Sequence, residues 1–196
     1  EYLQDAGTFT NINTPVARYV VYSQRYMVMA GDLVEPNRLH ISARDAYGTY
    51  FGDPAPNDAI RIDVGSILPN SGPIRGILSF RDKLLVLFAE GVVIGTLGIY
   101  DDEGNHTPDF NDSVEQYGSI THRGAVSHGD DALMLDLVGV PSLRRTVLSA
   151  QLKPERVSYL VDPLITEALA GVSLTALEDR VFCIYDYKEG QFMLFI

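Results

Sequence analysis

The segment 100–117 carries oxygen-bearing side chains of the kind that bind calcium in proteins. These side chains are Asp101, Glu103, Asn105, Asp109 and Asp112. Their spacing is not that of the calcium loop that two helices flank, so the motif itself does not imply a metal ion. We therefore expect this polar segment to project as a solvated loop, and we keep Asp101, Glu103 and Asn105 as its metal candidates.

Histidine and cysteine spacing predicts no further metal or redox site. The chain has 4 histidines and 1 cysteine. His122 and His128 fall on one face of a predicted strand, but a zinc pair needs closer ligands and a third partner. Cys183 lies in an apolar run, which predicts a buried and inert thiol. We expect structural or surface roles for these residues, and no bound cofactor.

Carboxylates for glycosidase chemistry have no local signature. That reaction needs two carboxylates about 5 to 9.5 Å apart. Local spacing selects no such pair among the 26 acidic residues, and the sequence has no nucleophile elbow or glycine-rich phosphate loop. The sequence therefore predicts a protein that is not an enzyme. A carbohydrate-active or carbohydrate-binding site built from distant segments stays open, with four tyrosines available for stacking: Tyr47, Tyr50, Tyr100 and Tyr117.

The segment 42–50 resembles the Asp-box turn of sialidase-type propellers, because it places a Ser, an Asp, a Gly and an aromatic residue within one hairpin. The gaps from Ser42 to Asp45 and from Asp45 to Gly48 are each one residue longer than in that turn. Even an intact Asp box is a structural turn. We therefore expect no catalytic role for this segment.

Three apolar runs in residues 74–98 form the centre of the predicted fold. Short polar corners separate runs that are rich in β-branched and aromatic residues, which is typical of an antiparallel meander. The middle run, Leu84 to Ala89, is apolar throughout. Such a strand needs cover on both faces, so we expect the meander to lie between similar sheets.

Similar groups of strands recur along the chain. The groups begin near residues 17, 74, 122 and 169, which lie 57, 48 and 47 residues apart. Repeats of this length with three or four strands indicate the blades of a β-propeller. We expect an all-β chain, with one propeller domain or part of one over residues 1–196. The predicted blade-like units are 16–64, 74–99, 117–150 and 169–196, and a short helical linker that Pro163 would break is predicted at 153–168.

A glycine recurs near the start of three units. The pairs are Arg75-Gly76, Arg123-Gly124 and Ala170-Gly171. Glycine has no Cβ, so these positions would let neighbouring backbones approach closely, although a bulge would explain them equally well. We expect structural roles for Gly76, Gly124 and Gly171, and ion pairs between units for Arg75 and Arg123.

The composition indicates a folded domain. Hydrophobic residues make up 46% of the chain, which excludes a disordered segment, and no run of 18 apolar residues could span a membrane. The net charge of −11 argues against a protein that grips nucleic acid by neutralising phosphates. The apolar strand 192–196 ends the chain, and its open edge would recruit other chains. We therefore expect a fragment of a longer chain, or an arc of a larger ring.

The succession of strands in residues 16–150 resembles the propeller region of tail nozzle proteins of short-tailed phages. This group includes the tail tubular and packaged-DNA stabilisation proteins. The segments that carry the resemblance are Arg38-Leu-His-Ile-Ser42, an aromatic segment ending Tyr50-Phe51, the alternating run 60–64, the run 74–88 and Gly118 to His128. In place of the short Asp-Pro turn of that pattern, this chain has Arg44 to Tyr47.

The resemblance implies a structural protein of the virion tail. It implies copies that assemble as a ring, usually a hexamer, below the portal and adaptor, where they continue the DNA channel and carry fibres or a plug. DNA would pass without specific binding, because an acidic lumen repels it. A protein-binding propeller scaffold is the other alternative, and it predicts an exposed patch of aromatic and arginine side chains on one rim.

Overall fold

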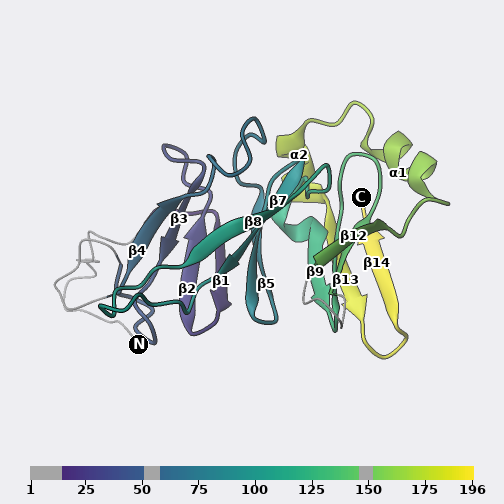
Figure 1. The fold of residues 1–196 in the computed structure, drawn as a ribbon. Coiled ribbons are helices and arrows are strands. Elements are labelled where there is room, and N and C mark those ends of the chain that lie inside the picture. Colours follow the sequence, from purple (N-terminus) through teal and green to yellow (C-terminus); the bar gives the residue numbers. More distant parts are fainter. Residues whose placement is uncertain (1–14, 51–57, 146–151) are drawn as a thin grey trace, which may run out of the picture.

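The computed structural model describes residues 15–50, 58–145 and 152–196, and it shows four antiparallel sheets and two α-helices in these residues (Figure 1). The first sheet contains β1 (Tyr19–Ser23), β2 (Tyr26–Ala30), β3 (Arg38–Ile41) and β4 (Ile60–Asp63). The second contains β5 (Gly76–Phe80), β6 (Lys83–Leu87), β7 (Gly91–Thr96) and β8 (Asp109–Glu115). The third contains β9 (Ala125–His128), β10 (Asp131–Met134), β11 (Pro141–Arg145) and β12 (Leu152–Arg156). The last is the hairpin of β13 (Phe182–Asp186) and β14 (Gln191–Phe195), which follows helices α1 (Asp162–Leu169) and α2 (Leu174–Arg180). The predicted all-β class is confirmed.

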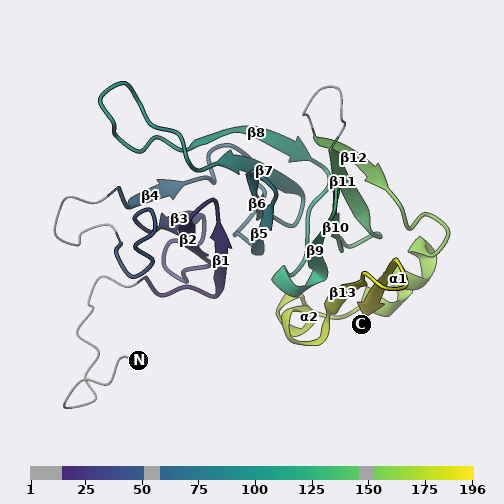
Figure 2. The same cartoon turned by 90° about the horizontal axis from the view of Figure 1, so that it is seen from below.

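Every sheet is a meander in which each strand pairs only with its neighbours in the sequence. Tight corners permit this arrangement: Gln24 and Arg25, between β1 and β2, have φ angles of 50° and 73°, as a two-residue hairpin turn requires. The first strands β1, β5, β9 and β13 contact one another in succession. The sheets therefore fan out as an arc from a shared inner edge (Figure 2), and the described residues do not close that arc into a ring.

Strand β6 is covered on both faces, as its uninterrupted apolar sequence predicts. Its residues Leu84 to Leu87 are all fully buried. Leu84 and Val86 belong to the core between the first and second sheets, whereas Leu85 and Leu87 belong to the core between the second and third. A third core joins the third sheet to the helices and the last hairpin.

The predicted loop 100–117 is wrong in its second half, because Asp109–Glu115 forms β8 and extends the second sheet well beyond residue 99. Only Phe110 in this strand is buried, and its ring fills the space beside Gly95, where a Cβ would lie 2.2 Å from it. β8 is an edge strand, so most of its side chains are polar and exposed. Because only one of its seven side chains is buried, β8 lacks the alternation of apolar and polar residues by which a strand is predicted from sequence.

The predicted helical linker 153–168 is also wrong in its first half. Residues 152–156 form β12, the outermost strand of the third sheet, and Pro154 lies within it. An edge strand tolerates proline because one row of its amides needs no partner. The prediction that Pro163 breaks a helix is wrong. Pro163 lies in the first turn of α1, where a backbone amide has no partner within the helix.

The predicted unit 169–196 does not begin with a strand. Gly171 adopts a φ of +76° just after α1, and Ser173 then caps α2 by accepting a hydrogen bond from the Ala176 amide at 3.3 Å. The fourth unit thus begins with a helix in place of a third strand. No helix in the described ranges is long and apolar enough to cross a membrane.

Candidate functional site

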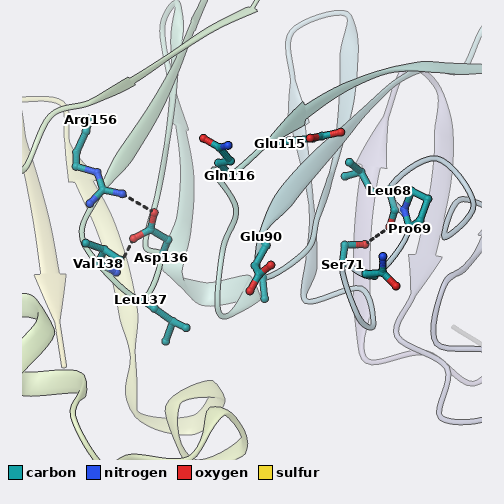
Figure 3. A pocket seen from close by; sticks show the side chains of 12 residues that line it. Leu68, Pro69, Ser71, Glu90, Glu115, Gln116, Asp136, Leu137, Val138 and Arg156 are labelled. Carbon is teal, nitrogen blue, oxygen red and sulfur yellow. Dashed lines mark hydrogen bonds and ion pairs between the residues drawn. The ribbon is translucent and has the colours of Figure 1, made fainter.

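A groove of about 480 Å³ opens where turns from three sheets meet (Figure 3). Its wall comes from the β4–β5 connection at 68–71, the β6–β7 turn at 89–90, the end of β8 at 115–116 and the β10–β11 turn at 136–138. Arg156, at the end of β12, completes it. These segments, far apart in the sequence, line one groove. The groove has the volume of a typical ligand site.

One wall of the groove is held by Asp136. Its Oδ1 accepts hydrogen bonds from the amides of Val138 and Gly139 at 2.7 and 2.6 Å, and its Oδ2 pairs with Arg156 at 3.2 Å. Arg156 also reaches Asp162 at 3.4 Å, which ties the turn to α1. These contacts hold the turn in place, and its Leu137 is 48% exposed.

The rest of the groove is acidic and solvent-exposed. Glu90 and Glu115 are exposed, and neither forms an ion pair within the described part of the chain. Their carboxyl groups do not point toward each other in Figure 3. Asn70 and Gln116 add amide groups to the lining. This arrangement can accept and donate hydrogen bonds and attract cations. It does not place the Glu90 and Glu115 carboxylates so that both face one glycosidic bond.

The metal candidates instead organise a turn. The Asp101 carboxylate accepts hydrogen bonds from the Glu103 and Asn105 amides at 3.0 and 2.8 Å and from Asn105 Nδ2 at 2.9 Å. These hydrogen bonds, led by the one from the Asn105 side chain, lower the pKa of Asp101. Among the described residues, no group of three His, Cys, Asp or Glu side chains is arranged to hold a metal ion.

Arg75 forms an ion pair across the fold, as predicted, and its partner is Glu178 on α2. Arg75 Nη1 lies 3.3 Å from Glu178 Oε1, and Arg18 Nη1 lies 3.3 Å from Oε2. The Tyr19 hydroxyl donates to the same carboxylate at 3.3 Å. Burial, followed by the nearby Glu178 charge, raises the pKa of Tyr19. We call these four residues the Glu178 cluster; it ties α2 to the first two sheets.

Replacing Glu178 with Gln is expected to destabilise the chain by about 2 kcal/mol. The value lies between the effects of exposed and buried pairs, because the Glu178 and Arg75 side chains are 18% and 17% exposed. Urea unfolding followed by circular dichroism measures it. Glu167→Gln, at an exposed site on α1, is the matched control and should stay within about 0.5 kcal/mol of wild type. Equal stabilities for the two variants would contradict a role for the cluster.

The glycines differ in what they do. A Cβ on Gly76 would lie 2.8 Å from the His122 backbone, so this glycine permits the close approach of two units. A Cβ on Gly124 would meet Thr121 Cγ2 at 2.9 Å, whereas Gly171 serves a turn with positive φ. Arg123 lies in the 3₁₀ turn η1 (His122–Gly124) and forms no ion pair with the described residues, so its ion pair stays a prediction.

His122 is expected to make the stability of the chain dependent on pH. Its Nδ1 accepts a hydrogen bond from the Ile77 amide at 3.4 Å, which requires a neutral ring. Burial, followed by the Arg123 charge, lowers the pKa of His122. The contribution to stability is therefore complete above the unfolded pKa of about 6.5 and is lost as the pH falls through the lower folded value.

We expect wild-type stability to fall between about pH 7 and pH 5, and the fall to be smaller in His122→Asn. The asparagine keeps an acceptor near the Ile77 amide but does not titrate. Urea unfolding at a series of pH values measures the difference. Parallel pH profiles for the two proteins would contradict the prediction.

A partly buried polar cluster that sequence spacing did not reveal joins the first sheet to residues 97–106. The Tyr100 hydroxyl lies 2.6 Å from the Tyr26 hydroxyl and donates to Asp58 Oδ2 at 2.7 Å. The His106 ring stacks on Tyr26 with centroids 4.7 Å apart. Burial opposes ionisation of Asp58, but the hydrogen bonds led by that from Tyr100 outweigh it and lower its pKa. The cluster is structural, because Tyr26 is fully buried.

The structure also tests the expectation for Cys183. Cys183 is buried, as predicted, and burial raises the pKa of its thiol to about 12.

Segment 42–50 is a structural turn: Ser42 Oγ accepts a hydrogen bond from the Met27 amide at 2.9 Å, and Asp45 forms an ion pair with Arg25 of the β1–β2 corner. None of the four tyrosines proposed for sugar stacking lines the groove.

A scan against models of protein families found no match to this chain, and a search of curated proteins found no matching sequence.

Proposed function

We propose that this chain is a propeller segment of a short-tailed phage tail, where it forms part of the nozzle through which DNA is retained and ejected. The observation that carries the proposal is the stacking of successive meanders around one inner edge, with β1, β5, β9 and β13 side by side. Propeller blades are arranged in this way. The likeness to tail nozzle proteins in residues 16–150 supports the same assignment.

The role is structural and does not involve catalysis. A tail channel must let the genome slide, so its surface should not neutralise phosphates. A net charge of −11 suits that requirement, since an acidic wall repels DNA within a Debye length of about 8 Å at physiological salt. The closed propeller and the ring of copies are part of this proposal.

The groove is the platform for another tail protein. Loops on rigid scaffolds often carry binding sites, and here the turns of three sheets contribute to one surface. Exposed Leu137 and Val138 line the same groove as Glu90 and Glu115. Such a surface suits a protein segment with basic and apolar side chains. A sugar would lack an aromatic platform in the described lining, so the carbohydrate alternative has less support.

Light scattering and negative-stain imaging of the purified chain test the proposal. The expected result is a ring, a hexamer by resemblance, with a central channel that does not retain duplex DNA at physiological salt. A globular particle without a channel that binds glycans on an array would overturn it and favour the carbohydrate alternative.

A further inference from the structure

An arginine stands just before the inner strand of every sheet, the inner strands being β1, β5, β9 and β13. Arg18 and Arg75 come directly before β1 and β5. Arg123 and Arg180 stand two positions before β9 and β13. The inner strands contact one another in succession, so this repeated position gathers four of the 15 Lys and Arg residues at the inner edge of the arc.

The inner strands run in the same direction, so the four arginines lie at one end of the fold (Figure 1). At the other end, Ser79 Oγ of β5 donates a hydrogen bond to Ser23 Oγ of β1 at 3.1 Å. At the arginine end, the rings of Tyr19 and His122 have centroids 5.2 Å apart, and the Gly76 backbone lies against that of His122. Each of these last three residues is the chain neighbour of one arginine, so the arginine backbones converge.

A second pocket, of about 150 Å³, opens at this end. Arg18, Tyr19, Arg75 and Glu178 line it together with residues 31–33. We call it the arginine pocket. Pockets for drug-sized molecules begin at roughly 300 Å³, so the arginine pocket fits a group of only a few atoms.

The two arginines of the pocket keep donors for a ligand. A guanidinium carries five N–H donors, and the ion pairs with Glu178 use Nη1 of each arginine. Arg75 Nε is buried and has no hydrogen-bond partner in the described part of the chain. A buried donor of this kind costs free energy until an acceptor reaches it.

The carboxylates at this end are already engaged or exposed. Glu178 is shared by both arginines of the pocket, and Asp32 Oδ1 accepts hydrogen bonds from two amides of its own turn at 2.7 and 3.4 Å. Asp179, next to Arg180, is exposed. Arg123 and Arg180 are exposed as well, and neither forms an ion pair with a described residue. Four arginines against these three carboxylates leave one positive charge in excess.

We propose that the arginine pocket binds a small oxyanion of the size of phosphate, held by the Arg18 and Arg75 guanidinium groups. The planar fork of N–H donors on arginine matches the oxygens of a phosphate. A polyanion such as DNA is a poor ligand here, because the pocket is small and the chain as a whole carries a charge of −11. This site goes beyond the proposed function, since a nozzle needs no bound ligand.

Titration calorimetry with inorganic phosphate at constant ionic strength tests the site. The wild-type chain should bind one phosphate in a saturable manner. Arg18→Gln should bind it about tenfold more weakly, because the substitution removes charge-assisted hydrogen bonds, and the 50% exposed side chain makes unfolding of the variant an unimportant effect. Arg144→Gln, exposed on β11, is the matched control and should bind phosphate as the wild type does. Circular dichroism checks that both variants fold.

Glu178→Gln gives a second readout that a purely structural cluster would not produce. The substitution removes the carboxylate that competes with phosphate for the two arginines. Phosphate should therefore bind this variant more tightly than the wild type, and it should raise the Tm of the variant by more than it raises that of the wild type.

Three results would each overturn the site: no saturable binding of phosphate, equal binding by Arg18→Gln and Arg144→Gln, or a phosphate-induced rise in Tm that is no larger in Glu178→Gln than in the wild type. A short DNA duplex that bound through Arg18 more tightly than phosphate would also overturn it, because the ligand would then be a polyanion. That last result would contradict the nozzle as well, whereas the first three concern the pocket alone.

Discussion

Leu84→Ala and Leu85→Ala are each expected to destabilise the protein by about 3 kcal/mol. Both side chains are fully buried, but they lie on opposite faces of β6 and belong to different cores. Each substitution removes three heavy atoms and leaves a cavity between two sheets. Because the cavities lie in separate cores, the double variant should lose about 6 kcal/mol, which is comparable to the whole stability of many domains.

Urea unfolding followed by far-ultraviolet circular dichroism measures these losses, since the chain has no tryptophan for fluorescence. Leu33→Ala is the control, because this leucine is 74% exposed and should change stability by less than about 0.5 kcal/mol. If only one of the two core variants were destabilised, β6 would be packed on one face alone, and the stacking of sheets on both sides of it would be wrong.

Gly118→Ala is expected to destabilise the protein by about 3 kcal/mol or more. A Cβ at this position would lie 2.2 Å from the Phe88 carbonyl oxygen and 2.7 Å from that of Ala89. Backbone atoms cannot move aside as a flexible side chain can. The Ser119 amide donates to the Phe88 oxygen at 2.8 Å, so a shift would also break the hydrogen bond that leads the chain from the second sheet to the third.

Gly98→Ala is the matched control for this substitution. A Cβ on Gly98 would have no neighbour within 4 Å, and the residue does not need a positive φ. The alanine should be neutral or stabilise by up to about 1 kcal/mol, because it restricts the unfolded chain. If the Gly118→Ala protein were as stable as the Gly98→Ala protein, the backbone that connects the second and third sheets would be able to move aside, and the prediction would be wrong.

Substitutions in the groove should change binding and not folding. The Glu90 and Glu115 side chains are exposed, so replacing them should leave folding intact and weaken only the binding of a partner with basic side chains.

The sequence by itself determined the strands that alternate or that are apolar throughout. The run from Leu84 to Ala89 requires cover on both faces because all its side chains are apolar, and this requirement places a sheet on each side. Cys183 was predicted to be buried for a similar reason. These inferences depend on the local period of side chains along a strand, and a sequence displays that period directly.

The same analysis did not predict the edge strands β8 and β12. β8 buries one side chain out of seven, and β12 contains Pro154, so neither has the pattern of a central strand. Both exist because a neighbouring strand, β7 or β11, supplies their hydrogen-bond partners. Tertiary context overrides weak local preference in such strands.

Only the tertiary structure decided the groove and the Glu178 cluster. The groove brings together turns from residues 68 to 156, and Arg75 meets a carboxylate 103 positions away on a helix that was not predicted. The ion pair was predictable for Arg75 as a type of contact, but its partner was not. Distant side chains converge because the sheets stack on one another. The angle between stacked sheets depends on the packing of all the cores together, so the local spacing of residues cannot predict it.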